Sequence, residues 1–162
     1  VSRLSEFFKE KGCPYWDEYA KQFGNMYFKN ETVTIVGGDC GSTCVYVLLL
    51  GAKKCIMFEK DPGLRRKAQE IAALLDMKDK IEIKGEWDGM TYPDTTVFLM
   101  DCEGCEEHVD IDLVTDKYNK VGIAVHEWTR NRTELLQRLV DRGYRLTYVT
   151  PDGKELYFTH EW

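Results

Sequence analysis

The chain has 162 residues, of which 43% are hydrophobic and 31% charged, a composition typical of one globular domain. Its 22 basic and 28 acidic residues give a net charge of −6 at pH 7, which argues against nucleic acid as a partner. The longest apolar stretch, residues 44–50, is too short to span a bilayer, and no signal-peptide pattern opens the sequence. We therefore expect a cytoplasmic protein without membrane contact, whose oligomeric state the sequence leaves open.

Strand and helix patterns alternate along most of the chain. Apolar residues recur at helical spacing over residues 3–23, in two pieces separated near residues 12–14. The predicted strands that follow are residues 32–36, 54–59, 80–84, 96–101 and 122–125. The predicted helices between them are residues 42–50, 61–76 and 131–142. A C-terminal hairpin is predicted from residues 144–149 and 155–159, because a Pro-Asp-Gly turn separates them.

This alternation predicts an α/β fold, in which helices cover both faces of a mainly parallel sheet. We expect a three-layer α/β/α sandwich with an antiparallel C-terminal β-hairpin at its edge. No repeat or linker divides the chain, so residues 1–162 are predicted to be a single domain, with an N-terminal helical segment (1–30) and a core (31–162). Ligands bind such sheets at the carboxyl ends of the strands. Polar residues that follow a strand are therefore the candidates for a site.

Three glycines follow the first predicted strand within five positions. Gly37, Gly38 and Gly41 would let backbone N–H groups and a helix N-terminus approach a ligand closely. Glu59 ends the second predicted strand, where a carboxylate can accept hydrogen bonds from two ribose hydroxyls. No Gly-Lys-Ser/Thr follows the glycines, which disfavours a phosphate-binding P-loop. Together these residues predict a nucleotide-type cofactor site, and a tight turn without a ligand is the alternative.

Four acidic residues lie within seven positions after the strand at 96–101: Asp101, Glu103, Glu106 and Glu107. Clustered carboxylates repel one another unless a partner neutralises them. A cationic cofactor, a metal ion or a helix N-terminus is a suitable partner. A polar loop that caps the next helix is the alternative.

Three segments resemble motifs of a known family. Residues 35–41 (IVGGDCG) and 50–62 (LGAKKCIMFEKDP) are similar to the first two motifs of class I S-adenosylmethionine-dependent methyltransferases. Residues 98–106 (FLMDCEGCE) are similar to the Asp-x-Glu-Gly-x-Glu signature of the FkbM-type methyltransferases. The resemblance spans about residues 30–160. It implies a Rossmann-like fold, S-adenosyl-L-methionine as cofactor, and methylation of a hydroxyl on a small molecule or sugar.

The resemblance also implies roles for individual residues. Those implied to bind the cofactor follow the first four strands and are Gly37, Gly38, Asp39, Gly41, Glu59, Lys60, Glu86, Trp87 and Asp101. The glycines and Asp39 would wrap its methionine part, Glu59 and Lys60 would hold the ribose, and Glu86 and Trp87 would flank the adenine. A hydroxyl acceptor also needs a base, and the candidates in order are Asp101, Glu103 and His126. No residue is assigned as a metal ligand.

The sequence departs from the family pattern at three places. Ile35 replaces an acid, Leu99 replaces a lysine, and residues 125–128 (VHEW) replace the family's Glu-x-His. A protein that binds S-adenosylmethionine without catalysis is therefore one alternative. A methyltransferase acting on RNA is the second, and a NAD-binding or thiol-based redox protein is the third.

Six cysteines are present, at positions 13, 40, 44, 55, 102 and 105. Their spacing does not resemble a small secreted disulfide scaffold, so free thiols are the expected state, and disulfides in a thermophile are the exception. Cys40, Cys44, Cys102 and Cys105 would come near one another if the first and fourth strands are neighbours. A zinc site, a disulfide or a redox switch at these four is the alternative to buried, apolar thiols.

Overall fold

The structure of the protein is a computed structural model that describes residues 3–23 and 26–162, so residues 1–2 and 24–25 of the predicted N-terminal segment lie outside the described residues. The described part of this segment forms two helices, α1 (Arg3–Glu10) and α2 (Tyr19–Gln22), with a short 3₁₀ turn, η1 (Trp16–Glu18), before the second. The predicted break falls between them. None of the described helices combines the length and apolar character needed to cross a lipid bilayer.

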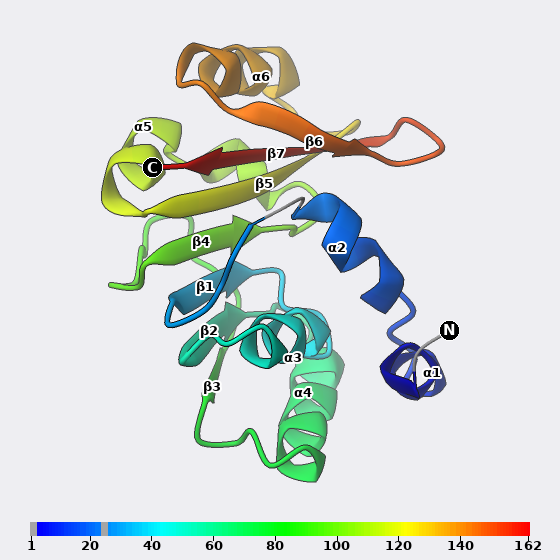
Figure 1. The fold of residues 1–162 in the computed structure, drawn as a ribbon. Coiled ribbons are helices and arrows are strands. Elements are labelled where there is room, and N and C mark those ends of the chain that lie inside the picture. Colours follow the sequence, from blue (N-terminus) through cyan, green and yellow to red (C-terminus); the bar gives the residue numbers. More distant parts are fainter. Residues whose placement is uncertain (1–2, 24–25) are drawn as a thin grey trace.

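Within the described residues, seven strands form one sheet in the order β3-β2-β1-β4-β5-β7-β6 (Figure 1). Their bounds are β1 Thr32–Val36, β2 Lys54–Phe58, β3 Ile81–Lys84, β4 Val97–Met100, β5 Lys120–His126, β6 Arg145–Val149 and β7 Glu155–Glu161. The first five strands pair in parallel, and β7 runs antiparallel to both β5 and β6. The mostly parallel sheet with antiparallel C-terminal strands is as predicted.

Helices cover both faces of the sheet because successive side chains along each strand point to opposite faces. The α-helices that follow β1 among the described residues are α3 (Ser42–Leu49), α4 (Pro62–Leu74), α5 (Ile111–Lys117) and α6 (Arg132–Asp141). On one face, Val33 and Ile35 of β1 belong to an apolar cluster with residues of α2, α3 and α4. On the other face, Val36 belongs to a cluster with residues of α5 and α6. The predicted three-layer α/β/α sandwich is therefore confirmed.

The ends of the helices show why the chain turns where it does. Asp61 caps α4 by accepting hydrogen bonds from the N–H groups of Gly63 and Leu64, and Pro62 occupies the first helical position. Gly41 takes a left-handed conformation (φ 83°) immediately before α3, which a side chain would disfavour. Because of these local preferences, the chain passes from the end of β1 into α3 and from the end of β2 into α4 after only a few residues. The loops that carry the candidate site are therefore short.

All six cysteines form disulfides, which pair Cys13 with Cys40, Cys44 with Cys55, and Cys102 with Cys105. The expectation of free thiols is therefore wrong, and Cys40, Cys44, Cys102 and Cys105 do not form a common cluster. Cys44 on α3 faces the neighbouring strand β2, where Cys55 lies 5.7 Å away between Cα atoms. Cys13 reaches Cys40 because α1 packs against α3 and α4. The first disulfide thus ties the N-terminal segment to the loop that follows β1.

Candidate cofactor-binding site

A cavity of about 1050 Å³ lies at the carboxyl ends of the parallel strands. Its walls come from the loops after β1, β2, β3, β4 and β5, and from the N-terminal segment through Tyr15, Glu18 and Tyr19. A cavity of this size lies near the upper end of the range for small-molecule and cofactor sites, about 300–1,000 Å³. Its position matches the general rule for ligand binding in open parallel sheets.

The glycines after β1 have different roles. Gly37 lines the cavity with φ 90°, and a Cβ atom placed there would lie 1.9 Å from the carbonyl oxygen of Asp101. Gly38 and Gly41 do not line the cavity. A Cβ atom at Gly38 would lie 2.7 Å from Met57, and one at Gly41 would lie 3.2 Å from Ala68. These two glycines therefore allow close packing of the turn against β2 and α4, and only Gly37 faces the cavity.

Glu59 and Asp39 place two carboxylates on the cavity wall between β1 and β2. Glu59 is buried, and its two oxygens accept hydrogen bonds from the backbone N–H groups of Asp39 (2.9 Å) and Asp61 (3.0 Å). Burial, together with the negative charges of Glu59, Asp101 and Glu103, raises the pKa of Asp39 to about 6. The wall is therefore suited to a ligand that brings hydroxyl donors and a positive charge.

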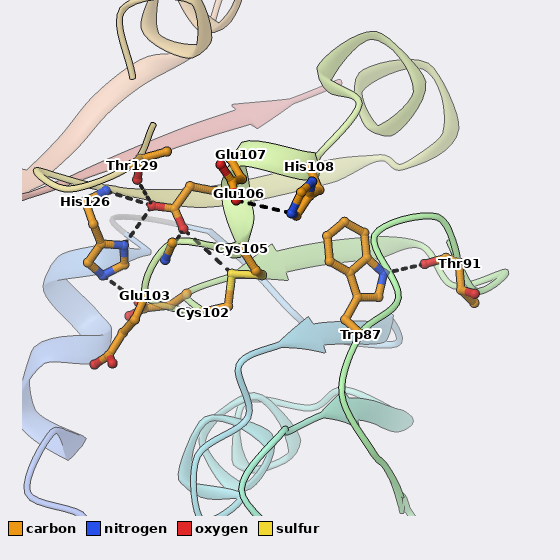
Figure 2. The surroundings of a disulfide bond; sticks show 12 residues. Trp87, Thr91, Cys102, Glu103, Cys105, Glu106, Glu107, His108, His126 and Thr129 are labelled. Atoms are coloured by element: carbon orange, nitrogen blue, oxygen red, sulfur yellow. Dashed lines mark hydrogen bonds and ion pairs between the residues drawn. A yellow bond between two sulfur atoms is a disulfide. The ribbon is translucent and has the colours of Figure 1, made fainter. Parts of the chain in front are cut away.

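The loop after β3 supplies an aromatic wall. Trp87 is 7% exposed, and its indole Nε1 donates a hydrogen bond to the carbonyl oxygen of Thr91 (2.7 Å; Figure 2). The ring of Tyr92 meets it edge to face at a centroid distance of 5.7 Å. Glu86 and Lys60 are exposed where they line the cavity. A fixed indole ring beside a polar rim can stack on a flat heterocycle.

His126 lies at the end of β5, beside the Cys102–Cys105 disulfide (Figure 2). Its ring Nδ1 lies 2.9 Å from Oε2 of Glu106, and its backbone N–H donates to the same oxygen at 2.8 Å. Thr129 also donates its hydroxyl to this oxygen. On the other side of the ring, Nε2 lies 3.4 Å from Oδ1 of Asp101 and 3.7 Å from Oε1 of Glu155. One buried imidazole is thus surrounded by three carboxyl groups.

The pKa values of this cluster follow from burial and mutual attraction. Burial lowers the pKa of His126, but hydrogen bonds to Asp101 and Glu106 and their charges outweigh it and raise the pKa to about 10. Burial raises the pKa of Glu106, and the hydrogen bonds from His126 and Thr129 reverse this and lower the pKa to about 2. Burial and the charge of Asp101 raise the pKa of Glu155 to about 8. At neutral pH His126 is therefore cationic, which favours Asp101 over His126 as an acceptor of protons.

The structure brings most of the predicted residues to one cavity and adds Glu155, which was not predicted. Gly37, Asp39, Glu59, Lys60, Glu86, Trp87, Asp101, Glu103 and His126 all line it. Glu103 is exposed, whereas the His126 ring is buried. Glu155 was missed because it reaches His126 only through the pairing of β7 with β5, in which these two residues are opposite each other. Glu106 was recognised as an acid, but its contact with His126 was not predicted.

No protein-family model matches the chain. Two relatives are similar in sequence over almost their whole length. Uncharacterized protein 158B of Sulfolobus islandicus rod-shaped virus 1 is 43% identical over 156 residues, which cover 96% of this chain and 97% of the relative. Uncharacterized protein 65 of Sulfolobus islandicus filamentous virus (isolate Iceland/Hveragerdi) is 39% identical over 153 residues, covering 94% of each.

Solved structures that share the fold include proteins described as methyltransferases. A precorrin-6y C5,15-methyltransferase of Geobacter metallireducens has a TM-score of 0.64 at 13% identity, over 92% of this chain and 87% of that one. A fibrillarin of Aeropyrum pernix with bound S-adenosyl-L-methionine has a TM-score of 0.61 at 13% identity, over 86% and 70%. A putative RNA methyltransferase of Pyrococcus horikoshii has a TM-score of 0.60 at 13% identity, over 92% and 83%.

These likenesses show that the fold is the Rossmann-like fold of class I methyltransferases. The narrower FkbM-type assignment is not confirmed, because no family model matches. The argument from net charge against nucleic acid is not supported either, since a protein described as a putative RNA methyltransferase is among the structures that share the fold.

Proposed function

The chain belongs to the same family as these two proteins of Sulfolobus islandicus viruses, and we propose that it is an S-adenosylmethionine-dependent methyltransferase. The observation that carries the proposal is the meeting of Gly37, Asp39, Glu59 and Asp101 at one cavity, although they come from three different strand ends. The methyltransferase fold supports it.

The residues present fit the cofactor. Each Glu59 oxygen accepts one backbone hydrogen bond, and a carboxylate oxygen has a second lone pair that can take a ribose hydroxyl. Gly37 exposes backbone without a side chain, and Asp39 offers a carboxylate for the amine of the methionine part. Trp87 and Glu86 would flank the adenine. S-adenosylmethionine, when bound, supplies an activated methyl group.

The chain's own residues would then orient the acceptor and take up its proton. Asp101 lies at the end of β4, and His126 holds it by an ion pair at 3.4 Å. Asp101, followed by Glu103, is the proposed base for a hydroxyl acceptor on a small molecule or sugar, since His126 is already protonated at neutral pH. The Asp101-Cys102-Glu103-Gly104-Cys105-Glu106 stretch supports the narrower FkbM-type assignment.

We also propose that residues 1–162 act as a single domain, since Tyr15, Glu18 and Tyr19 of the N-terminal segment line the cavity. RNA is the second candidate for the acceptor, and the fold shared with a protein described as a putative RNA methyltransferase supports it. The acidic wall formed by Asp39, Glu59 and Glu103 opposes it, because phosphate groups are repelled there. A cytoplasmic location stays a prediction.

Calorimetry with S-adenosylmethionine, S-adenosylhomocysteine and NAD tests the cofactor. We expect both sulfur compounds to bind with one site per chain, and Glu59→Ala to lower their affinity. Glu82→Ala is the matched control, because Glu82 is an exposed acid on β3 that does not line the cavity. Binding of NAD alone would contradict the proposal. Binding of the sulfur compounds without transfer to any hydroxyl or RNA acceptor would support a cofactor-binding protein without catalysis.

A further inference from the structure

Three different metal-binding side chains converge at one end of the cavity. His126 Nε2, a carboxylate oxygen of Asp101 and a carboxylate oxygen of Glu155 all lie within 4.8 Å of one another. They come from the ends of β4 and β5 and from the start of β7. We propose that Asp101, His126 and Glu155 form a binding site for one divalent transition-metal ion. From the sequence, Asp101 and His126 were predicted to be catalytic, and no residue was predicted to bind a metal.

The distances between the donor atoms suit a single ion. His126 Nε2 lies 3.4 Å from Asp101 Oδ1 and 3.7 Å from Glu155 Oε1. Adjacent ligands of an octahedral ion with bonds of about 2.1 Å lie about 3 Å apart. Shifts of less than about 1 Å in the two carboxylates would therefore bring all three atoms to bonding distance. Side-chain rotation alone can supply such shifts, because Asp101 and Glu155 are only partly buried.

The imidazole is held as metal-binding histidines are held. Its Nδ1 lies 2.9 Å from Oε2 of Glu106, a fully buried carboxylate that also accepts hydrogen bonds from the His126 backbone and from Thr129. A carboxylate on one ring nitrogen fixes the ring and directs the other nitrogen to the metal. Figure 2 shows this arrangement, with Glu106 on one side of the His126 ring. Glu106 is therefore a positioning residue for the site.

The surroundings of Glu155 also support the site. Its Oε1 is buried and accepts no hydrogen bond from the described residues, and it makes only the long ion pair with His126 Nε2 at 3.7 Å. Buried carboxylate oxygens are normally satisfied, and a bound cation satisfies one as well as a donor does. The antiparallel pairing of β5 with β7 places Glu155 opposite His126, so the backbone itself holds this oxygen beside the imidazole.

The donor set indicates which ions would bind. One imidazole nitrogen with two carboxylates favours Mn²⁺, Co²⁺ or Zn²⁺ over Ca²⁺ and Mg²⁺, which prefer oxygen ligands alone. Two ionised carboxylates balance the charge of a divalent ion, and metal binding would displace the proton on Nε2 of His126 to solvent. Three protein ligands leave coordination positions open, and all three ligands line the cavity, so those positions face it. An acceptor hydroxyl could occupy one of these open coordination positions. This role in acceptor binding rests on the proposed function, whereas the metal site itself does not.

Mn²⁺ binding to the full chain tests the site, because bound and free Mn²⁺ differ in their electron paramagnetic resonance signal. The chain is first treated with a chelator and desalted with its disulfides intact. Wild type should bind one Mn²⁺ per chain. Glu155→Gln and Asp101→Asn should each weaken binding at least about tenfold, since even the loss of an outer partner costs 10- to 100-fold. Glu127→Gln is the matched control, because Glu127 is an exposed acid next to His126 that does not line the cavity.

The two variants keep the test decisive, provided that circular dichroism shows at least one of them folded. Failure of folded wild type to bind Mn²⁺ overturns the site. Equal affinity in a folded ligand variant and in Glu127→Gln also overturns it. Binding of S-adenosylhomocysteine in the presence of chelator is measured separately. A chain that binds Mn²⁺ but not S-adenosylhomocysteine would reject only the proposed function. A chain that binds S-adenosylhomocysteine but not Mn²⁺ would reject only the metal site.

Discussion

Replacing Gly37 tests the close approach between the loop after β1 and the backbone of the loop after β4. Gly37 has φ 90°, a conformation that disfavours any side chain. An added Cβ atom would lie 1.9 Å from the carbonyl oxygen of Asp101 and 2.9 Å from the Cα atom of Cys102. Backbone atoms cannot rotate away as a side chain can, so the loop that carries Asp101 would have to move. We expect Gly37→Ala to destabilise the fold and to displace Asp101.

The size of the effect follows from two contributions. A left-handed conformation costs a residue with a side chain about 1–2 kcal/mol. Overpacking of a filled region costs about 1–3 kcal/mol more. The expected loss is therefore about 2–5 kcal/mol, a large part of the about 5–15 kcal/mol that stabilises a typical domain. Gly143→Ala is the matched control, because Gly143 has φ 80° but an added Cβ would meet no described heavy atom within 4 Å.

Urea unfolding followed by circular dichroism measures both variants with the disulfides intact. Gly143→Ala should lose only the conformational contribution of about 1–2 kcal/mol. Gly37→Ala should lose clearly more. Equal losses in the two variants would refute the close approach of the two loops, and with it the placement of Asp101 beside Gly37.

Three further predictions concern the cavity wall and the disulfides. Glu59→Gln leaves the backbone N–H of either Asp39 or Asp61 without its acceptor. Urea unfolding should therefore show a loss of about 1–3 kcal/mol in the free energy of unfolding. An unchanged free energy of unfolding would contradict these hydrogen bonds. The pKa of Asp39 is raised from 3.8 to about 6, so its ionised form, which would attract the cofactor amine, forms as the pH rises through 6. Calorimetry should therefore show tighter binding of S-adenosylhomocysteine at about pH 7 than at about pH 5. Asp39→Asn should remove this difference in affinity. If the affinity of the variant depends on pH as strongly as that of the wild type, the pH dependence belongs to another group. The Cys13–Cys40 disulfide closes a loop of 27 positions and the Cys102–Cys105 disulfide one of only 3. Replacing both cysteines of a pair by Ala should therefore lower the free energy of unfolding by about 3.5 kcal/mol for Cys13–Cys40 and by about 1.6 kcal/mol for Cys102–Cys105. Thermal unfolding measures both variants, and a larger loss in the Cys102–Cys105 variant would contradict the loop-closure argument.

The fold was largely predictable from periodicity and turn residues. The first strand was predicted at residues 32–36, and β1 has the same bounds, because a buried apolar run between a polar turn and a glycine cluster has few alternatives. Helix α5 was not predicted. Only Ile111, Val114 and Thr115 are buried in it, so a short helix with many polar residues leaves no clear apolar pattern. Its cap at Asp110 was the one available signal.

The site was predictable only where a residue follows its own strand. Asp39, Glu59 and Asp101 follow β1, β2 and β4, so the rule for parallel sheets brings them together. Glu155 begins a hairpin strand, and the sequence does not show that β7 inserts between β5 and β6. The Cys13–Cys40 disulfide likewise depends on how the N-terminal segment packs against α3 and α4. Long-range pairings of this kind carry no local pattern.

A crystal structure of the chain with S-adenosylhomocysteine tests the central claim most directly. We predict that the ligand lies in the cavity at the carboxyl ends of β1, β2 and β4, with its ribose hydroxyls hydrogen-bonded to Glu59. Its methionine part should lie against Gly37 and Asp39, and its adenine against Trp87. A ligand bound elsewhere, or a ribose that makes no contact with Glu59, would contradict the account.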